Sequence, residues 1–117
     1  TLGSCAVFDC QFDTGFINAQ LLIIRPNGAE PQYLHSLLSS KPMSDHFARI
    51  ATGAAVKQLT GKQIGALKIP LPPLDLQQRF ARIVESVEQQ KARMRTHLEE
   101  LDTLFASLQS RAFNGEL

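Results

Sequence analysis

The sequence lacks the short motifs by which common enzyme classes are recognised. It has no phosphate-binding glycine loop, no GxSxG turn, no HExxH helix and no glycine-rich dinucleotide turn. His35 and His46 fall on segments expected to form short helices, where packed or exposed histidines are more common than catalytic ones. The residues themselves therefore point to no reaction.

Cysteine is scarce too: Cys5 and Cys10 are the two in the chain, and no histidine lies close to them in the sequence. Metal sites usually combine a CxxC pair with further Cys or His ligands, so we interpret both as ordinary reduced thiols of a cytoplasmic protein. Asp9 and Asp13 could be carboxylates of a nuclease metal site. Since no third acid or lysine stands at a suitable spacing, we interpret them as turn residues.

The sequence contains no 18-residue apolar run and no strong charge imbalance. Its 117 residues carry a formal net charge of +1, so bulk charge identifies no partner, and we expect no membrane span. No basic segment followed by an apolar one is visible at the start. Because the chain begins at Thr1 with residues that resemble a turn and a strand, we expect an earlier part of the same domain to precede it.

Proline and glycine are absent from residues 75–113, whereas residues 1–74 hold all 6 prolines and every glycine except Gly115. This shift divides the chain into a domain at 1–74 and a long helix with its C-terminal cap at 75–117. In the first part, apolar runs predict strands at 5–8, 18–26 and 67–71. Helices are predicted at 31–40, at 44–51 with Ser44 or Asp45 as cap, and at 62–67 behind a Thr60–Gln63 capping box. We expect an α+β fold.

The second part is predicted to be one helix from Leu76 to Phe113, roughly 57 Å long at 1.5 Å per residue, ending at Asn114-Gly115. Asp75 is its expected N-cap, with Gln78 in position to reach back. Pro72 and Pro73 fit neither a strand ladder nor a helix interior, so the chain should turn a rigid corner there. The predicted hinge comprises Pro70, Pro72, Pro73 and Asp75.

The helix carries apolar residues at alternating spacings of four and three, which is typical of a coiled-coil seam. The predicted pairing interface comprises Phe80, Val84, Val87, Lys91, Met94, Leu98, Leu101, Phe105, Leu108 and Ala112. The alternative is a helix lying on its own domain, but a domain of this size would be only about 25–30 Å across. The sequence therefore predicts a partner helix. Lys91 interrupts the seam, either without purpose or to set register or partner choice.

Localised charge gives a weaker signal. No acid occurs between Asp45 and Asp75, and basic residues in that window alternate with small polar ones. Such side chains contact phosphates and base edges, although a solvated basic face is the alternative. The predicted DNA-binding residues are Arg49, Thr52, Gly53, Lys57, Gln58, Thr60, Lys62 and Gln63, with Lys68 nearby.

These residues lead to a family resemblance. The stretch IPLPPLDLQQRF, followed by a long helix ending LFASLQSRAFNGEL, resembles the specificity subunits of type I restriction–modification systems. The upstream FINAQLLIIRP, YLHSLLSS and ATGAAVKQLTGKQIGALKIPLP resemble the second half of that family's target recognition domain, so the resemblance covers about residues 14–117. The chain departs from the family pattern in being one half only and in lacking the first part of the recognition domain.

The resemblance implies a non-catalytic component that recognises half of a bipartite site in double-stranded DNA. It implies that residues 51–63 face DNA and that residues 80–112 pair antiparallel with a second spacer helix, from a homodimer or from an absent half. It also implies docking to methyltransferase subunits and, through them, to restriction subunits. No cofactor is expected in this chain, because S-adenosylmethionine, ATP and magnesium would belong to those partners. A coiled-coil scaffold that does not read DNA is the alternative; a small nuclease is a third reading.

Overall fold

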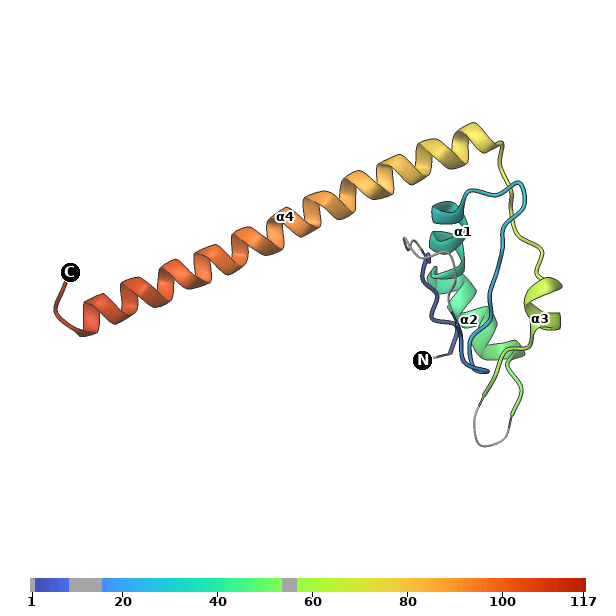
Figure 1. Cartoon of the computed structure of the whole chain (residues 1–117), viewed down its shortest axis with the longest axis horizontal. Coiled ribbons are helices and arrows are strands. Elements are labelled where there is room, and N and C mark those ends of the chain that lie inside the picture. Colours follow the sequence, from blue (N-terminus) through green and yellow to red (C-terminus); the bar gives the residue numbers. More distant parts are fainter. Residues whose placement is uncertain (1, 9–15, 54–56) are drawn as a thin grey trace. The chain divides into compact units, whose positions relative to one another are not determined.

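A computed structural model of the chain describes residues 2–8, 16–53 and 57–117. Four helices follow one another along it: α1 (Pro31–Leu38), α2 (Lys41–Ile50), α3 (Gly61–Gly65) and α4 (Leu74–Phe113) (Figure 1). The chain divides into two compact units, Thr1–Ala81 and Arg82–Leu117. The first two turns of α4 therefore belong to the first unit, and the remainder of α4 forms the second.

The first unit is built on α1 and α2, which pack against each other. The Glu30 carboxylate caps α1 by accepting a hydrogen bond from the Tyr33 amide at 2.7 Å. The core of the described residues is small: Leu38 and Phe47 are its buried apolar side chains. A domain with so little buried apolar surface is marginally stable by itself.

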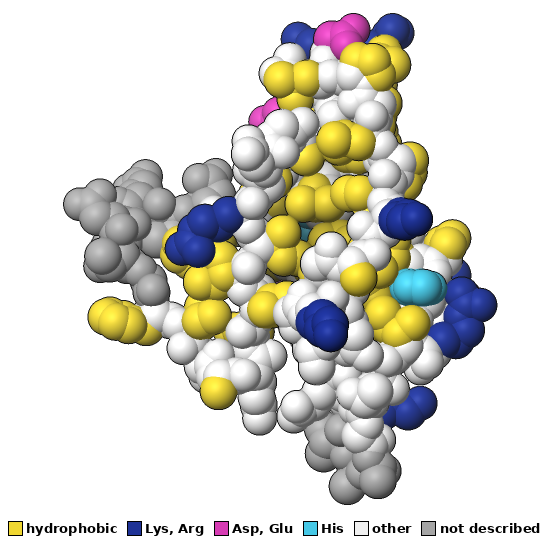
Figure 2. All heavy atoms as spheres, turned by 90° about the vertical axis from the view of Figure 1, so that its right-hand side faces the viewer, with side chains coloured by type: hydrophobic (Ala, Val, Ile, Leu, Met, Phe, Trp, Pro, Cys, Tyr) yellow, Lys and Arg dark blue, Asp and Glu magenta, His cyan; other side chains and the backbone are white. Residues whose placement is uncertain are grey.

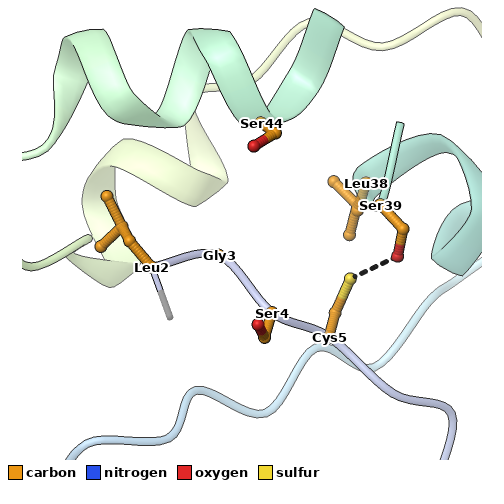
Figure 3. Close-up of a pocket in the computed structure, with 7 residues that line it drawn as sticks. All are labelled: Leu2, Gly3, Ser4, Cys5, Leu38, Ser39 and Ser44. Atoms are coloured by element: carbon orange, nitrogen blue, oxygen red, sulfur yellow. Dashed lines mark hydrogen bonds between the residues drawn. The ribbon is translucent and has the colours of Figure 1, made fainter. Parts of the chain in front are cut away.

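Residues 3–5 contact these two helices and the residue that follows α1. Gly3 adopts a positive φ of 75°, and a Cβ atom there would stand 2.7 Å from the Phe47 ring, so only glycine fits. The His35 imidazole hydrogen-bonds the Cys5 carbonyl oxygen at 3.0 Å. The Cys5 thiol lies 3.1 Å from the Ser39 hydroxyl, as Figure 3 shows. The start of the described chain is thereby tethered to the helical core.

The strand component of the α+β prediction is not confirmed. Within the described residues the predicted strands at 5–8, 18–26 and 67–71 are irregular, and the recorded β pairing is one isolated bridge between Thr52 and Gln58. A strand needs a partner for its ladder of hydrogen bonds. Residues 18–21 form a turn in which the Asn18 side chain accepts from the Gln20 amide, and the side chains of residues 21–24 are exposed. The sequence pattern is strand-like, but in the part of the chain that the structure describes no strand lies beside these residues.

The helix predictions fare better, with corrections at several boundaries. Helix α1 is confirmed from Pro31 but ends at Leu38 rather than at residue 40, and the capping box of α3 is confirmed although that helix spans Gly61–Gly65 rather than 62–67. Helix α2 begins at Lys41 rather than at residue 44, because Pro42 is accepted in a first turn that needs no amide hydrogen there; Ser40 is its cap. Helix α4 begins at Leu74, so Asp75 lies inside the first turn and is not the N-cap.

The predicted long helix is confirmed as one continuous element of 40 residues (Figure 1). It ends at Phe113, directly before Asn114-Gly115, as the sequence predicted. Gly115 has a φ of 72°, the Gly115 amide donates to the Ala112 carbonyl at 3.2 Å, and the Glu116 amide donates to the Arg111 carbonyl at 2.9 Å. This pair of bonds is a Schellman motif, which satisfies carbonyls that a helix end would leave unpaired.

Candidate nucleic-acid interface

A short loop between α2 and α3 carries most of the predicted DNA-binding residues. Its base is closed by the Thr52–Gln58 bridge, in which the Thr52 amide donates to the Gln58 carbonyl at 3.1 Å and the Gln58 amide donates back at 2.8 Å. Gly53 follows with a backbone φ of 124°, a value that residues other than glycine rarely adopt. The bridge and the glycine together place Lys57, which is exposed, at the rim of the loop.

A second set of hydrogen bonds ties this loop to both flanking helices. The Gln63 amide donates to the Thr60 hydroxyl at 3.3 Å, and the Gln63 side-chain oxygen accepts from the Thr60 amide at 2.8 Å. The Gln63 side-chain nitrogen donates to the Ile50 carbonyl at 2.6 Å. The start of α3 is therefore joined to the last residue of α2, and the loop between them begins and ends at fixed points.

The predicted DNA-binding residues thus fall into two groups. Thr60 and Gln63 have their side chains engaged in the capping box, and Thr52 and Gln58 contribute their backbone to the bridge. Arg49 in the last turn of α2, Lys57 at the loop rim and Lys62 in α3 are exposed. The structure therefore brings these cations to one loop and its flanking turns, with the polar residues holding the backbone that carries them.

Acidic residues are absent from this stretch of the sequence, since none occurs between Asp45 and Asp75. Lys68, also exposed, adds a further cation. Figure 2 shows one face of the molecule on which Lys and Arg side chains are spread among apolar ones, with acidic side chains only towards the top of the view. A surface of this kind attracts an anionic partner at long range, more strongly at low salt.

The junction into α4 is held by Gln77, whose side chain is 1% exposed and is the most deeply buried one described. Its side-chain oxygen accepts from the Glu30 amide at 2.9 Å, and its side-chain nitrogen donates to the Pro72 carbonyl at 2.7 Å. The Gln77 backbone amide donates to the Pro73 carbonyl at 3.2 Å. One side chain therefore joins the start of α1, the proline segment and the first turn of α4.

Tyr33 reinforces the same junction. Its hydroxyl donates to the Pro70 carbonyl at 2.9 Å, and its ring meets the Phe80 ring edge to face, with centroids 5.8 Å apart. The carbonyls of the three prolines in the predicted hinge therefore all accept hydrogen bonds. Sequence reasoning missed Gln77, Tyr33 and Glu30. Gln77 lies three residues before Phe80, which puts both on one helix face, and a polar residue on an apolar face was the available signal.

The predicted seam of α4 is exposed beyond this junction. Phe80 is 39% exposed and Val84 is partly buried, whereas the apolar seam residues further along range from 41% at Leu108 to 68% at Met94. Lys91, the polar member of the seam, forms an ion pair with Glu88 at 2.6 Å. The hydrogen bond from Lys91 lowers the pKa of the Glu88 carboxyl.

Other features of the described residues add no second site. No group of three or more His, Cys, Asp and Glu side chains that could hold a metal is found among residues 2–8, 16–53 and 57–117. Asp9, Cys10 and Asp13, considered above for metal binding, lie outside those residues. No described helix is long and apolar enough to cross a membrane. The open hollow in Figure 3, lined by residues of segment 2–5, α1 and α2 and by Ser39, carries no charged side chain.

Comparison with known proteins gives one consistent result. Residues 4–103 match the family model described as the type I restriction modification DNA specificity domain. A protein of Methanocaldococcus jannaschii, provisionally named as the type I restriction enzyme MjaX specificity subunit, is 32% identical over 90 residues. That alignment covers 74% of this chain and 21% of the relative, so the chain spans about a fifth of the length of the curated protein it matches. No solved structure matches the chain.

Proposed function

Because the chain belongs to the family of type I restriction–modification DNA specificity domains, we propose that it is the sequence-recognising component of such a complex. In this role residues 1–74 bind one half of a bipartite site in double-stranded DNA, and residues 75–117 connect that half to its counterpart. The observation that supports DNA contact is the acid-free loop between α2 and α3, with Arg49, Lys57 and Lys62 exposed on a hydrogen-bonded base.

In the proposed recognition of DNA, the exposed cations and the hydrogen-bonded polar residues of the loop have different roles. Exposed lysine and arginine side chains contact phosphates, which supplies affinity and position without sequence information. The polar residues Thr52, Gln58, Thr60 and Gln63 hydrogen-bond the backbone at the two ends of the loop, so that Gly53 and Lys57 stand next to fixed points. Base reading in the grooves requires such a fixed frame.

The remaining parts of the proposal concern partners. The chain itself is proposed to be non-catalytic and free of cofactors. Methyltransferase subunits that use S-adenosylmethionine, and restriction subunits that use ATP and magnesium, would carry out the chemistry. The exposed seam of α4 supplies the surface for the second spacer helix.

The test is a selection from randomised duplex DNA, using the chain together with the methyltransferase subunit of the same genome. An enriched short motif is the expected result. Replacing both Lys57 and Lys62 by alanine should weaken binding to all sequences and reduce the slope of log affinity against log salt by about 2, because two phosphate contacts are lost. Lys41→Ala is the matched control, since Lys41 is a lysine of α2 that pairs with Asp45.

A coiled-coil scaffold that reads no DNA is the second candidate, and the observation favouring it is the same exposed seam on α4. The two candidate functions predict different results in the selection from randomised duplex DNA. Binding of the complex without enrichment of any motif would contradict DNA reading and favour the scaffold. An enriched motif whose affinity is unchanged in the Lys57/Lys62 variant would keep the function and remove the loop as its contact surface.

A further inference from the structure

One glutamine side chain joins the helices on either side of the loop that carries the cations. We propose that Gln63 is a positioning residue for DNA recognition. It reads no base itself, but it holds the segments that carry the exposed cations in the arrangement on which discrimination between sequences depends. This inference rests on the proposed function. It adds the residue that supports discrimination, and it changes the role of Gln63 from the DNA contact expected from the sequence.

The side-chain amide of Gln63 is engaged at both ends. Its nitrogen donates to the Ile50 carbonyl at 2.6 Å. Its oxygen accepts from the Thr60 amide at 2.8 Å and from the Thr60 hydroxyl at 3.0 Å. A glutamine that reads adenine uses one donor and one acceptor together, and a glutamine amide has two N–H groups and one oxygen with two lone pairs. Gln63 therefore cannot read a base in this way without losing bonds that it already makes.

These bonds connect two helix ends. Ile50 is the last residue of α2, and its carbonyl is one of those that a helix end leaves without an intrahelical partner. Thr60 is the N-cap of α3, where the first amides of the helix also need acceptors. Among the described residues, the bond from Gln63 to Ile50 is the one hydrogen bond recorded between α2 and α3. Without this side chain the two helix ends would move independently.

The exposed cations stand next to the points that are held. Arg49 and Lys62 are the residues directly before the two that the bond joins. Lys57 is the residue directly before the second member of the β bridge. Like charges on neighbouring segments repel each other, and a hydrogen bond between neutral groups opposes this without being screened by salt as an ion pair is. The segments that carry the three cations therefore keep one arrangement at low and at high salt.

A fixed arrangement of cations matters more for discrimination than for affinity. Phosphate contacts place a protein on the duplex, and base contacts supply the sequence preference. Cations held in one arrangement meet the regular phosphates in one register, which brings the base-reading side chains to one place in the groove. Cations that move relative to each other still find phosphates, because these are present in every duplex. Loosening the arrangement therefore lowers the preference for the target site more than the non-specific affinity.

Gln63→Met tests the inference in the complex of this chain with the methyltransferase subunit. Methionine has a similar length to glutamine but no N–H donor and no carbonyl. Affinity for a duplex with the selected motif should fall about fivefold, because the loop must then be ordered on binding. Affinity for a duplex without the motif should change by less than about twofold, and the slope of log affinity against log salt should stay the same. Fluorescence anisotropy with labelled duplexes measures all three quantities.

Other roles for Gln63 give different results in the same measurements. A base contact would remove the preference at one base pair, whereas positioning predicts an even loss over all base pairs of the motif. A phosphate contact would reduce the salt slope by about 1. A purely structural role would lower both affinities by the same factor, because fewer molecules would be folded. Each of these three results, or no change at all, would overturn the inference.

Two further variants serve as controls. Thr60→Val removes the hydroxyl that accepts from the Gln63 backbone amide, but it leaves the side-chain bond to the Ile50 carbonyl. This variant should keep most of the preference for the target. An effect as large as that of Gln63→Met would assign the role to the start of α3 and contradict the inference. Gln89→Met makes the same chemical change at an exposed position of α4 and should have no effect.

Amide hydrogen exchange without DNA gives a second measurement. Residues 50–52 and 57–60 should exchange faster in Gln63→Met than in the wild type, whereas α1 should keep its protection, because the lost bond lies at the base of the loop. Unchanged exchange at the base of the loop would show that Gln63 does not hold it and would refute the inference.

The selection with the wild-type chain separates this inference from the proposed function. An enriched motif together with an unchanged preference in Gln63→Met would refute the inference and leave the proposed function intact. A wild-type chain that enriches no motif would contradict the proposed function, and the inference that rests on it would fail as well.

Discussion

At the scale of single residues, Gln77 shows that one side chain can hold several segments of the chain together. It is polar, it is the most buried side chain described, and both ends of its amide are hydrogen-bonded to backbone groups of other segments. A buried polar group with all its partners in place favours one arrangement of the segments that supply those partners. Glutamine fits because it donates and accepts at one end, which neither leucine nor glutamate does at neutral pH.

Replacing Gln77 by alanine should destabilise the first unit by about 2–4 kcal/mol, because the Glu30 amide and the Pro72 carbonyl lose their partners in a buried place. Tyr33 is the single tyrosine and the chain has no tryptophan, so the near-ultraviolet circular dichroism of tyrosine reports on this junction during denaturation. Gln89→Ala, an exposed glutamine of the same helix, should change stability by less than about 0.5 kcal/mol. Equal effects of the two variants would contradict the structural role of Gln77.

At the scale of elements, predictions from the sequence succeeded where the cause is local. The capping box of α3 needs only Thr60 and Gln63 three residues apart, and the end of α4 needs only Gly115 after a helical run. The predicted strands were not confirmed because an apolar run indicates only a tendency to be buried. A strand also needs an adjacent segment with which to pair. Gln77 was missed for the same reason, since its partners stand 47 and 5 residues away. The roles of the loop cations and of the seam remain predictions.

The seam of α4 permits a direct test at this scale. Leu98 is 59% exposed in the single chain, so Leu98→Glu should leave the helix content of the monomer unchanged. It should abolish association through α4, because a carboxylate would be buried in the seam without a partner. Sedimentation of the variant checks this, with Gln89→Glu on the outward face as the control. If Leu98→Glu kept the original association, residues 80–112 would not be the pairing interface.

At the scale of the whole molecule, the two units differ in what stabilises them. The first unit has a small core, a tethered N-terminal segment and the Gln77 junction. In the second unit every side chain is exposed or only partly buried. Helices in water gain most of their stability from packing, so α4 beyond residue 81 depends on a partner far more than the first unit does.

Amide hydrogen exchange should therefore respond differently to protein concentration in the two units. Protection at residues 84–108 should rise as the chain is concentrated, because association covers the seam, whereas protection in α1 and α2 should stay constant. Mass spectrometry of proteolytic fragments resolves these segments. A rise in protection that is equal throughout the chain would instead indicate that both units gain stability from association.

The two hydrogen-bond networks of the first unit also have an evolutionary consequence. The network at the base of the loop uses Ile50, Thr52, Gln58, Thr60 and Gln63. The network at the junction uses Glu30, Tyr33, Pro70, Pro72 and Gln77, and the two sets have no residue in common. Substitutions between the two anchor points of the loop can therefore accumulate in a lineage without altering the attachment of α4. Under the proposed function, a population could therefore diversify its target sequences while the surface proposed to bind partner subunits stays the same.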